Sequence, residues 1–486
     1  MSWLSYCYKT YQNSVSEIGK QQPGKVPLLP VAHTTQQVNI EVELDKDGNF
    51  QYAGLLAQDQ RTTIIPCTEE SSARTSGMVP HPLVDKLQYI AADYPTFGGS
   101  KESGWPLYHK QLQAWCTSPY AHPAVCTVLH YLEKECLIAD LVKANILFID
   151  ENGTLPTKWQ GNKEDKPPIL DTLTGSDQTE SFVRFRVDNV DLSRDTTVRE
   201  SFIRFYETQL KDIDYCTVQG IKMPVSTLSP YKIRNPGDRA KLISSNDNTN
   251  YTYRGRFADA AQALSIGYET TQKAHSALRW LVSKQGVNTG DQTVLVWGTQ
   301  NEAVPNVLGD TLDIAQEYNP LAGVDWDDFE EDTERLPADT QEEIARQFNR
   351  AILGYQHQLK DNSQTAVMIL DSATPGRLSI RYYQELQGSK LLANIKDWHD
   401  TFQWQLEYRS VEEPTELGKK PKIKKVVFVG APAPADIAKA AYGEKVDAKL
   451  KQATIERLIP CITNGERFPR DLMISAVDRA TNSIGL

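Results

Sequence analysis

The chain has 486 residues, a formal net charge of −11, and 40% hydrophobic and 24% charged residues. This length allows roughly two to four domains, and the composition is ordinary for a globular protein, which excludes disorder of the chain as a whole. The sequence has no apolar run of about 18 residues and no signal-peptide layout at its start, so we expect a cytoplasmic protein without membrane contacts.

The cysteines number seven, are spread along the chain and form no CxxC pair, which indicates reduced thiols. Three of them lie near two histidines, and such a set could hold zinc; the residues are Cys116, Cys126, Cys136, His122 and His130. Their spacing is unlike that of common zinc sites, which favours cysteines packed in the core. We therefore expect neither a metal nor another cofactor.

Charge is distributed unevenly. Residues 301–350 contain 14 acidic and 3 basic residues, so this segment alone accounts for the net charge of the whole chain. Residues 222–256 instead contain 7 basic and 2 acidic residues. A phosphate backbone responds to local potential, so this basic strip could bind nucleic acid within an acidic protein.

The N-terminal part, residues 1–150, is expected to be a mixed α/β region. Alternating apolar residues on both sides of a DKDGN turn predict a hairpin over 38–55. The stretch 82–94 is helix-like, and apolar residues at helical spacing predict two helices within 105–145.

A polar, turn-rich segment at 151–169 suggests a boundary, after which residues 151–415 form a central α+β region containing the basic strip. Its periodicity predicts strands and helices in this order: a strand at 181–190, helices at 196–212 and about 270–285, a buried strand at 293–298, a helix from 340, and a strand pair at 365–372 and 377–386.

An apolar run, VVFVG, and then a mostly helical pattern occupy residues 416–486, which we interpret as the start of a helical C-terminal region. The whole pattern predicts an α+β fold: a mixed N-terminal α/β region with antiparallel hairpins and a helical C-terminal part.

Enzyme motifs are missing from the sequence, which contains no GxSxG, GxxxxGK[ST], HExxH or GxGxxG. The glycine-rich stretch 98–104 could cradle a phosphate, but it also fits an ordinary loop. His275 lies on a predicted helix without a nucleophile or acid arranged beside it, which favours a packed histidine. A metal-dependent nuclease is the alternative to a binding protein; it would use Asp325, Asp327 and Asp328 of an acidic stretch that otherwise fits a solvated loop.

The basic strip combines cations, rings and amides. Six basic side chains could contact phosphates: Lys232, Arg234, Arg239, Lys241, Arg254 and Arg256. Interleaved rings could stack on bases, and amides could bond the backbone or base edges; they are Tyr231, Tyr251, Tyr253, Phe257, Asn235, Asn246 and Asn248. The alternative is a solvated loop that pairs with the acidic segment.

Two further segments are candidates. SSARTSG is small enough to enter a DNA groove, although it also fits a surface turn; its candidate residues are Ser71, Ser72, Arg74, Thr75, Ser76 and Gly77. GKKPKIKK, at 418–425, could position a phosphate backbone, or could be an edge strand protected by lysines.

Long stretches of the chain resemble one protein family. The segment KLISSNDNTNYTYRGRFADAAQALSIGYETTQKAHSALRWLVSKQG, followed by GDQTVLVWG, is similar to a signature of the large subunit of type I-C CRISPR Cascade. The resemblance extends to YCTVQGIKMPVSTLSPYKI, RTSGMVPHPLVDKLQYI and TAVMILDSATPGRLSIRYYQEL, in family order. Similar family members continue in a longer helical region than the TNSIGL ending of this chain.

The resemblance implies a subunit without catalytic activity. Such a subunit joins a guide RNA complex with backbone, foot and small subunits. It recognises the protospacer-adjacent motif on target double-stranded DNA, helps to open the duplex, holds the displaced strand and presents the site to a helicase-nuclease. The guide then supplies the remaining sequence discrimination by base pairing. A purely structural subunit without DNA contacts is the remaining alternative.

Overall fold

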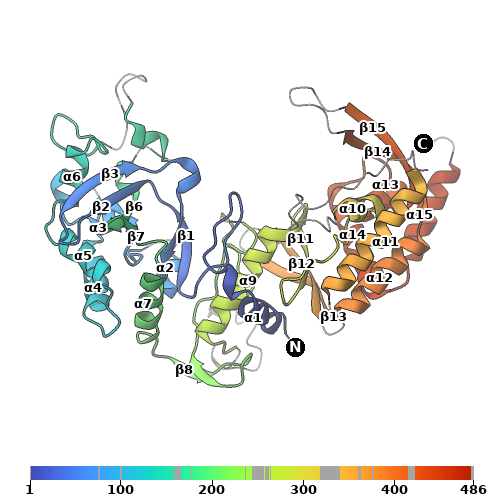
Figure 1. Cartoon of the computed structure of the whole chain (residues 1–486), viewed down its shortest axis with the longest axis horizontal. Coiled ribbons are helices and arrows are strands. Elements are labelled where there is room, and N and C mark those ends of the chain that lie inside the picture. The colour runs from blue at the N-terminus through green and yellow to red at the C-terminus, as the bar shows by residue number, and fades with distance from the viewer. Residues whose placement is uncertain are drawn as a thin grey trace, which may run out of the picture. The chain divides into compact units, whose positions relative to one another are not determined.

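The computed structural model contains helices and largely antiparallel sheets, which confirms the predicted α+β class (Figure 1). The chain divides into two compact units: unit 1 is Met1–Tyr11, Val15–Ile233 and Ile243–Trp280, and unit 2 is Gln12–Ser14, Arg234–Leu242 and Leu281–Leu486. The structure describes residues 2–74, 77–98, 101–156, 159, 166–173, 175, 177–235, 237–243, 257, 262, 264–317, 340–359, 363–374, 377–413 and 422–482.

Unit 1 begins with a helix and then alternates strands with short and long helices. Its elements are α1 (Trp3–Asn13), β1 (His33–Gln37), β2 (Ile40–Leu44), β3 (Phe50–Leu55), β4 (Thr62–Pro66), α2 (Glu69–Ser72), β5 (Asp85–Lys86), α3 (Leu87–Ile90), α4 (Trp105–Cys116), α5 (Pro123–Leu132), α6 (Leu137–Lys143), β6 (Phe182–Val187), β7 (Val190–Asp191), α7 (Thr196–Glu207), β8 (Ile213–Tyr215), β9 (Lys222–Pro224) and α9 (Tyr268–Gln285), of which the last residues belong to unit 2.

The main sheet of unit 1 has the order β3-β2-β6-β5, with β7 beside β6. Strands β2 and β3 pair in antiparallel fashion, which confirms the hairpin predicted over 38–55, and β2 pairs with β6 in parallel. In the hairpin turn, the Asp45 carboxylate accepts the backbone N–H of Asn49 at 2.8 Å, and Gly48 has a φ of 75°. A Cβ at Gly48 would lie 3.2 Å from the carbonyl oxygen of Thr127 on α5, so the turn needs glycine.

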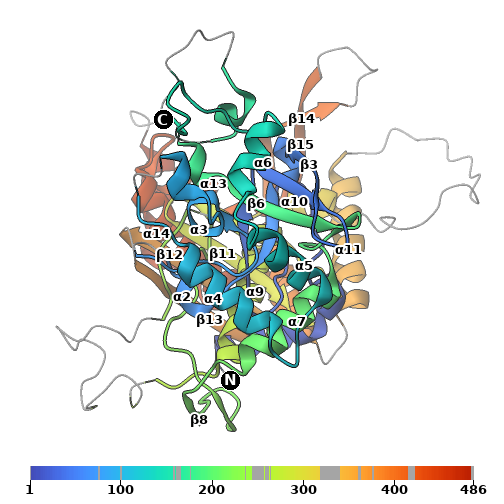
Figure 2. The ribbon, with the colours of Figure 1, turned by 90° about the vertical axis from the view of Figure 1, so that its left-hand side faces the viewer.

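Helices α4, α5 and α7 lie on the side of unit 1 that faces the viewer in Figure 2. Trp115 of α4 is fully buried, and its ring centroid is 5.0 Å from that of Phe202 and 6.2 Å from that of Phe205, both on α7. The indole N–H of Trp115 donates to Ser201 Oγ at 2.9 Å. This aromatic group joins α4 to α7 within the core of unit 1.

Unit 2 contains a four-stranded sheet, a two-stranded sheet and several helices. Its elements are β10 (Val287–Thr289), β11 (Gln292–Gly298), α10 (Thr311–Glu317), α11 (Thr340–Gln358), β12 (Gln364–Thr374), β13 (Arg377–Gln387), α12 (Gly388–Thr401), β14 (Trp404–Glu413), β15 (Lys422–Gly430), α13 (Pro434–Tyr442), α14 (Ala448–Asn464) and α15 (Arg470–Thr481).

The larger sheet of unit 2 has the antiparallel order β10-β11-β12-β13. Strand β11 is buried along its whole length, as predicted for 293–298, and the pairing of β12 with β13 confirms the predicted strand pair at 365–372 and 377–386. Residues of α12 and α14, including Leu391 and Leu458, share one hydrophobic core with this sheet. Helices α13, α14 and α15 confirm the helical C-terminal part.

Two helical predictions were wrong in detail. Within 82–94 only Leu87–Ile90 is α-helical, because Asp85 and Lys86 pair with β6 first. The stretch 105–145 forms three helices rather than two. Pro123 starts α5 after α4 has ended, and Glu135, with a φ of 52°, lies between α5 and α6. The apolar residues keep helical spacing across both of these breaks between helices.

We expect Phe202→Ala to lower the free energy of unfolding of unit 1 by about 3–5 kcal/mol, because it removes a buried ring that packs against Trp115. Leu107→Ala on α4 is the control, since Leu107 is 48% exposed, and its cost should stay near ~0.5 kcal/mol. Urea denaturation followed by circular dichroism measures both. Equal losses in the two variants would contradict this account of the core.

Candidate nucleic-acid interface

Ser71 and Ser72 are the first two residues of the candidate segment SSARTSG (71–77), and their hydroxyl groups form hydrogen bonds within and around helix α2. Thr68 and Ser71 form a capping box, in which Ser71 N–H donates to Thr68 Oγ1 at 3.0 Å and Thr68 N–H donates to Ser71 Oγ at 2.9 Å. Ser71 Oγ also lies 2.9 Å from His81 Nδ1. Ser72 Oγ donates to the carbonyl of Glu69 at 2.8 Å. Both hydroxyl groups therefore stabilise the segment itself.

Arg74 is held by a buried carboxylate. Its Nη1 donates to Asp85 Oδ2 at 2.8 Å and its Nη2 to Asp85 Oδ1 at 3.0 Å, while Nη1 also donates to the carbonyl of Val79 at 2.8 Å. The Asp85 side chain is fully buried and that of Arg74 is 12% exposed. The guanidinium also lies 4.6 Å from the centroid of the Tyr89 ring. This bidentate ion pair fixes the position of Arg74, which lies shortly after the end of α2.

Glu69 joins the region around α2 to the beginning of the basic strip. Its buried carboxylate accepts hydrogen bonds from Thr227 Oγ1 at 3.0 Å and from the backbone N–H of Leu228 at 2.8 Å, and Ser226 Oγ donates to it as well. Its own backbone N–H donates to the hydroxyl of Tyr206 at 2.8 Å. Two segments far apart in sequence thus meet at one side chain.

Tyr231 and Lys232 follow residues 226–228, which are bonded to Glu69, and lie near other positively charged side chains of unit 1. Tyr231 is within electrostatic range of the guanidinium groups of both Arg74 and Arg279. Lys232 is within the same range of His81, and burial together with nearby cations lowers the pKa of His81 to about 4. We call Arg74, Lys232 and Arg279, gathered around Tyr231, the basic cluster.

The part of the basic strip from Arg234 to Leu242 belongs to unit 2. Arg234 is engaged there, since Nε donates to Asp238 Oδ2 at 3.0 Å and Nη1 to the carbonyl of Asp291 at 2.9 Å. Asn235 is exposed, and its side-chain oxygen accepts the backbone N–H of Gly237. Arg239 is exposed and Lys241 is half-buried. Lys232 and these four residues are therefore divided between the two units.

Several predicted residues lie outside the described part of the chain. From the segment after α2 these are Thr75 and Ser76, whereas Gly77 is described and exposed, with a φ of 86°. From the strip they are Asn246, Tyr253, Arg254 and Arg256, together with Tyr251 and Asn248. Asp325, Asp327 and Asp328 of the nuclease alternative, and Lys419 and Lys420 of the third basic patch, also fall outside it.

Arg279 is a residue that the sequence analysis did not select as a site. It is 7% exposed on α9, and its Nε and Nη2 have no hydrogen-bond partner among the residues that the structure describes. Burial lowers its pKa to about 10. One turn earlier, His275 is fully buried, its Nδ1 lies 2.8 Å from the carbonyl oxygen of Thr271, and its ring meets that of Trp3 edge-on. The prediction of a packed histidine at 275 is confirmed. Sequence periodicity could not reveal that Arg279, one turn later, has two nitrogens without a partner in the described part of the chain.

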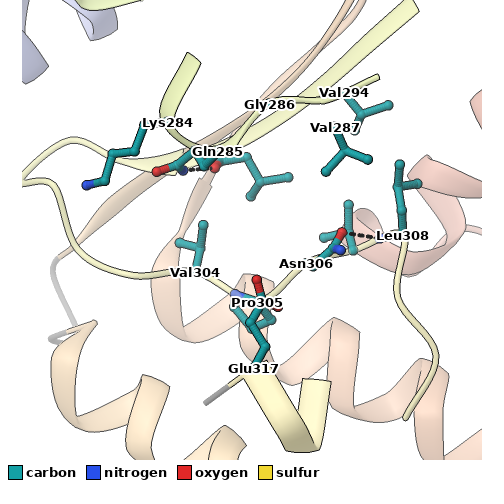
Figure 3. Close-up of a pocket in the computed structure, with 12 residues that line it drawn as sticks. Lys284, Gln285, Gly286, Val287, Val294, Val304, Pro305, Asn306, Leu308 and Glu317 are labelled. Atoms are coloured by element: carbon teal, nitrogen blue, oxygen red, sulfur yellow. Dashed lines mark hydrogen bonds between the residues drawn. The ribbon is translucent and has the colours of Figure 1, made fainter. Parts of the chain in front are cut away.

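Where the structure describes the chain, no three His, Cys, Asp or Glu side chains gather in a way that could hold a metal ion, and no helix is long and apolar enough to cross a bilayer. Unit 2 contains a pocket of about 260 Å³ whose walls include Val287, Val294 and Val304 (Figure 3). Among its described lining residues, Lys284 and Glu317 carry charge.

The chain is a CRISPR-associated protein. Residues 7–486 match the family described as CRISPR-associated protein (Cas_Csd1), so the chain belongs to that family, the large subunit of type I-C Cascade, which works with other Cascade components. A search of curated proteins finds no match.

We expect Asp85→Ala to lower the free energy of unfolding by about 3–5 kcal/mol, because it leaves the guanidinium of Arg74 buried without its counter-ion. Asp171→Ala is the control: its carboxylate is 69% exposed and pairs with Lys166 at 2.6 Å, so the expected loss is below ~1 kcal/mol. Urea denaturation of both variants provides the comparison. If Asp85→Ala cost no more than its control, Arg74 would not depend on this carboxylate.

Proposed function

We propose that this chain recognises the protospacer-adjacent motif on double-stranded DNA for its surveillance complex. In this proposal it also aids duplex opening, stabilises the displaced strand and helps to recruit the helicase-nuclease. The observation that supports it best is the junction at Glu69, which brings the segment after α2 beside Tyr231 and Lys232. Two segments selected independently for DNA contacts thus lie together in unit 1.

The charge of this region suits a nucleic-acid surface. Lys232, Arg74 and Arg279 come from three separate stretches of a chain whose net charge is −11. Contacts with phosphates supply affinity without sequence preference, while the guide provides discrimination over most of the target. A subunit with this task needs a local basic surface and few base contacts, and its acidic remainder can face solvent or other subunits.

Within this proposal the residues have different tasks. Residues 71–77 contact the motif, and Arg74 positions that segment through Asp85 instead of reaching for a base. Backbone phosphates are held by the basic residues of the strip, and its amides and rings supply further contacts; these residues are Lys232, Arg234, Arg239, Lys241, Arg254, Arg256, Asn235, Asn246 and Tyr253.

We further propose that the chain itself cuts nothing and acts in the cytoplasm. Its partners are the guide RNA, the backbone, foot and small subunits, and the helicase-nuclease that cleaves after recruitment. The basic cluster contains cations and rings but no arrangement of a nucleophile with a base, which fits binding better than hydrolysis.

The proposal is tested by charge reversal within a reconstituted guide complex. Lys232→Glu should weaken binding of target duplex by about 10-fold or more and reduce the salt slope by about 1, with the order of preference among adjacent motifs retained. Arg239→Glu, at an exposed position of unit 2, should act in the same direction. Lys143→Glu is the matched control, because its side chain is 77% exposed on α6 outside the basic strip.

The thermal midpoints of all variants must first match that of the wild type, so that a loss of affinity reports on contacts. Wild-type affinity and salt slope in both Lys232→Glu and Arg239→Glu would remove the strip from the interface. A loss of similar size in Lys143→Glu would indicate a general charge effect in place of a defined surface.

A further inference from the structure

Strands β8 and β9 form a hairpin at the surface of unit 1 (β8 is labelled in Figure 1). In its antiparallel register Tyr215 lies opposite Lys222, and Ile213 lies opposite Pro224. Directly opposed residues point to the same side of a sheet, so these four side chains share one face. Ile213 is 66% exposed and Tyr215 is 58% exposed. Exposed apolar side chains that lie together, as these two do, mark binding surfaces more often than scattered ones.

The opposite face of the hairpin holds it to helix α9. Met223 lies on that face, and its sulfur accepts a hydrogen bond from Thr270 Oγ1 at 3.7 Å. Cys216, directly after β8, is 1% exposed, and its sulfur lies 3.7 Å from the same hydroxyl group. The hairpin is thus anchored through one face, which leaves Ile213 and Tyr215 accessible on the other.

Both ends of the basic strip are attached to this hairpin. Lys222 is the first basic residue of the strip and belongs to β9. Beyond the far end of the strip, the carbonyl of Ser265 accepts the backbone N–H of Thr217 in the hairpin turn at 2.9 Å. The carbonyl of Ile266 accepts the backbone N–H of Ser226, just after β9, at 2.9 Å. The chain that carries the strip therefore leaves the hairpin and returns to it.

The exposed face combines an aromatic ring with a cation. Lys222 Nζ lies 5.2 Å from the centroid of the Tyr215 ring. An accessible tyrosine ring offers a flat surface on which a nucleobase can stack, and a neighbouring lysine can meet the adjoining phosphate. Residues 211–224 contain two lysines and two aspartates, so the charges of the hairpin cancel. Affinity at this face must therefore come mainly from stacking, whereas the rest of the strip supplies positive charge.

We propose that the exposed face of the β8–β9 hairpin binds an unpaired base of the displaced DNA strand, which stacks on Tyr215. This inference rests on the proposed function and assigns one contact of the displaced strand to a particular residue. Bases within a duplex stack on each other, whereas pairing of the guide with the target strand leaves the displaced bases unpaired. Ile213 extends the apolar surface beside the ring. Every base has a flat face, so this contact is independent of sequence.

The first test measures binding of target duplex by the reconstituted guide complex. Tyr215→Ala should weaken binding by about 10-fold without changing the salt slope, because the lost contact is uncharged. Tyr215→Phe keeps the ring and should bind as the wild type does. Tyr52→Ala is the matched control, since Tyr52 is 64% exposed on β3 outside the strip, and its affinity should not change. All variants should keep the thermal midpoint and motif preference of the wild type.

The second test places a fluorescent base analogue at successive positions of the displaced strand, because its fluorescence falls when it stacks on a ring. At one position or more, the wild type and Tyr215→Phe should quench the analogue, whereas Tyr215→Ala should not. A parallel arm places the analogue in the unpaired end of the guide RNA, where no dependence on Tyr215 is expected.

Wild-type affinity and quenching in Tyr215→Ala, with motif preference intact, would overturn this inference and leave the proposed function standing. Dependence on Tyr215 in the guide RNA arm alone would assign the face to the guide and overturn the assignment to the displaced strand. Failure of Tyr215→Ala to join the guide complex before DNA is added would make the face a protein contact, which also overturns it. If the wild-type chain adds nothing to DNA binding, the proposed function fails and this inference fails with it.

Discussion

The carboxylate of Glu69 is the interaction on which the arrangement of the basic cluster depends. It is buried, and residues 226–228 satisfy it with two hydroxyl groups and one backbone N–H. The segments it joins are separated by about 150 residues, so holding them together opposes a substantial chain entropy. Because Tyr231 and Lys232 follow directly, this one acidic side chain brings Lys232 into the neighbourhood of Arg74, where both act on His81.

The cluster contains two arginines in different situations. Arg74 has a fully buried carboxylate as its partner and positions the segment after α2. Arg279 is buried and has no such partner among the described residues. Retaining a buried cation without such a partner costs stability. The acidic net charge of the chain is compatible with this site, since phosphate contacts depend on local potential.

The sequence predicted much of the fold but only part of the interface. Strong periodicity revealed the hairpin at 38–55, the buried strand at 293–298 and helix α9. It could not show that Asp85 pairs with β6, which shortened the helix predicted at 82–94, because that pairing depends on contacts distant in sequence. Composition selected Arg74 and Lys232 as separate candidates, and the structure places both near His81. Whether an arginine is paired, as Arg74 is, or unpaired, as Arg279 is, requires the structure.

The most direct test of the account is the binding of target duplex by a reconstituted guide complex, with and without this chain, across a set of adjacent motifs and several salt concentrations. The account predicts that the chain adds both a preference among motifs and a steeper dependence on salt. Equal affinity, preference and salt dependence without the chain would contradict it, and the chain would then be a structural subunit or a docking surface for the nuclease.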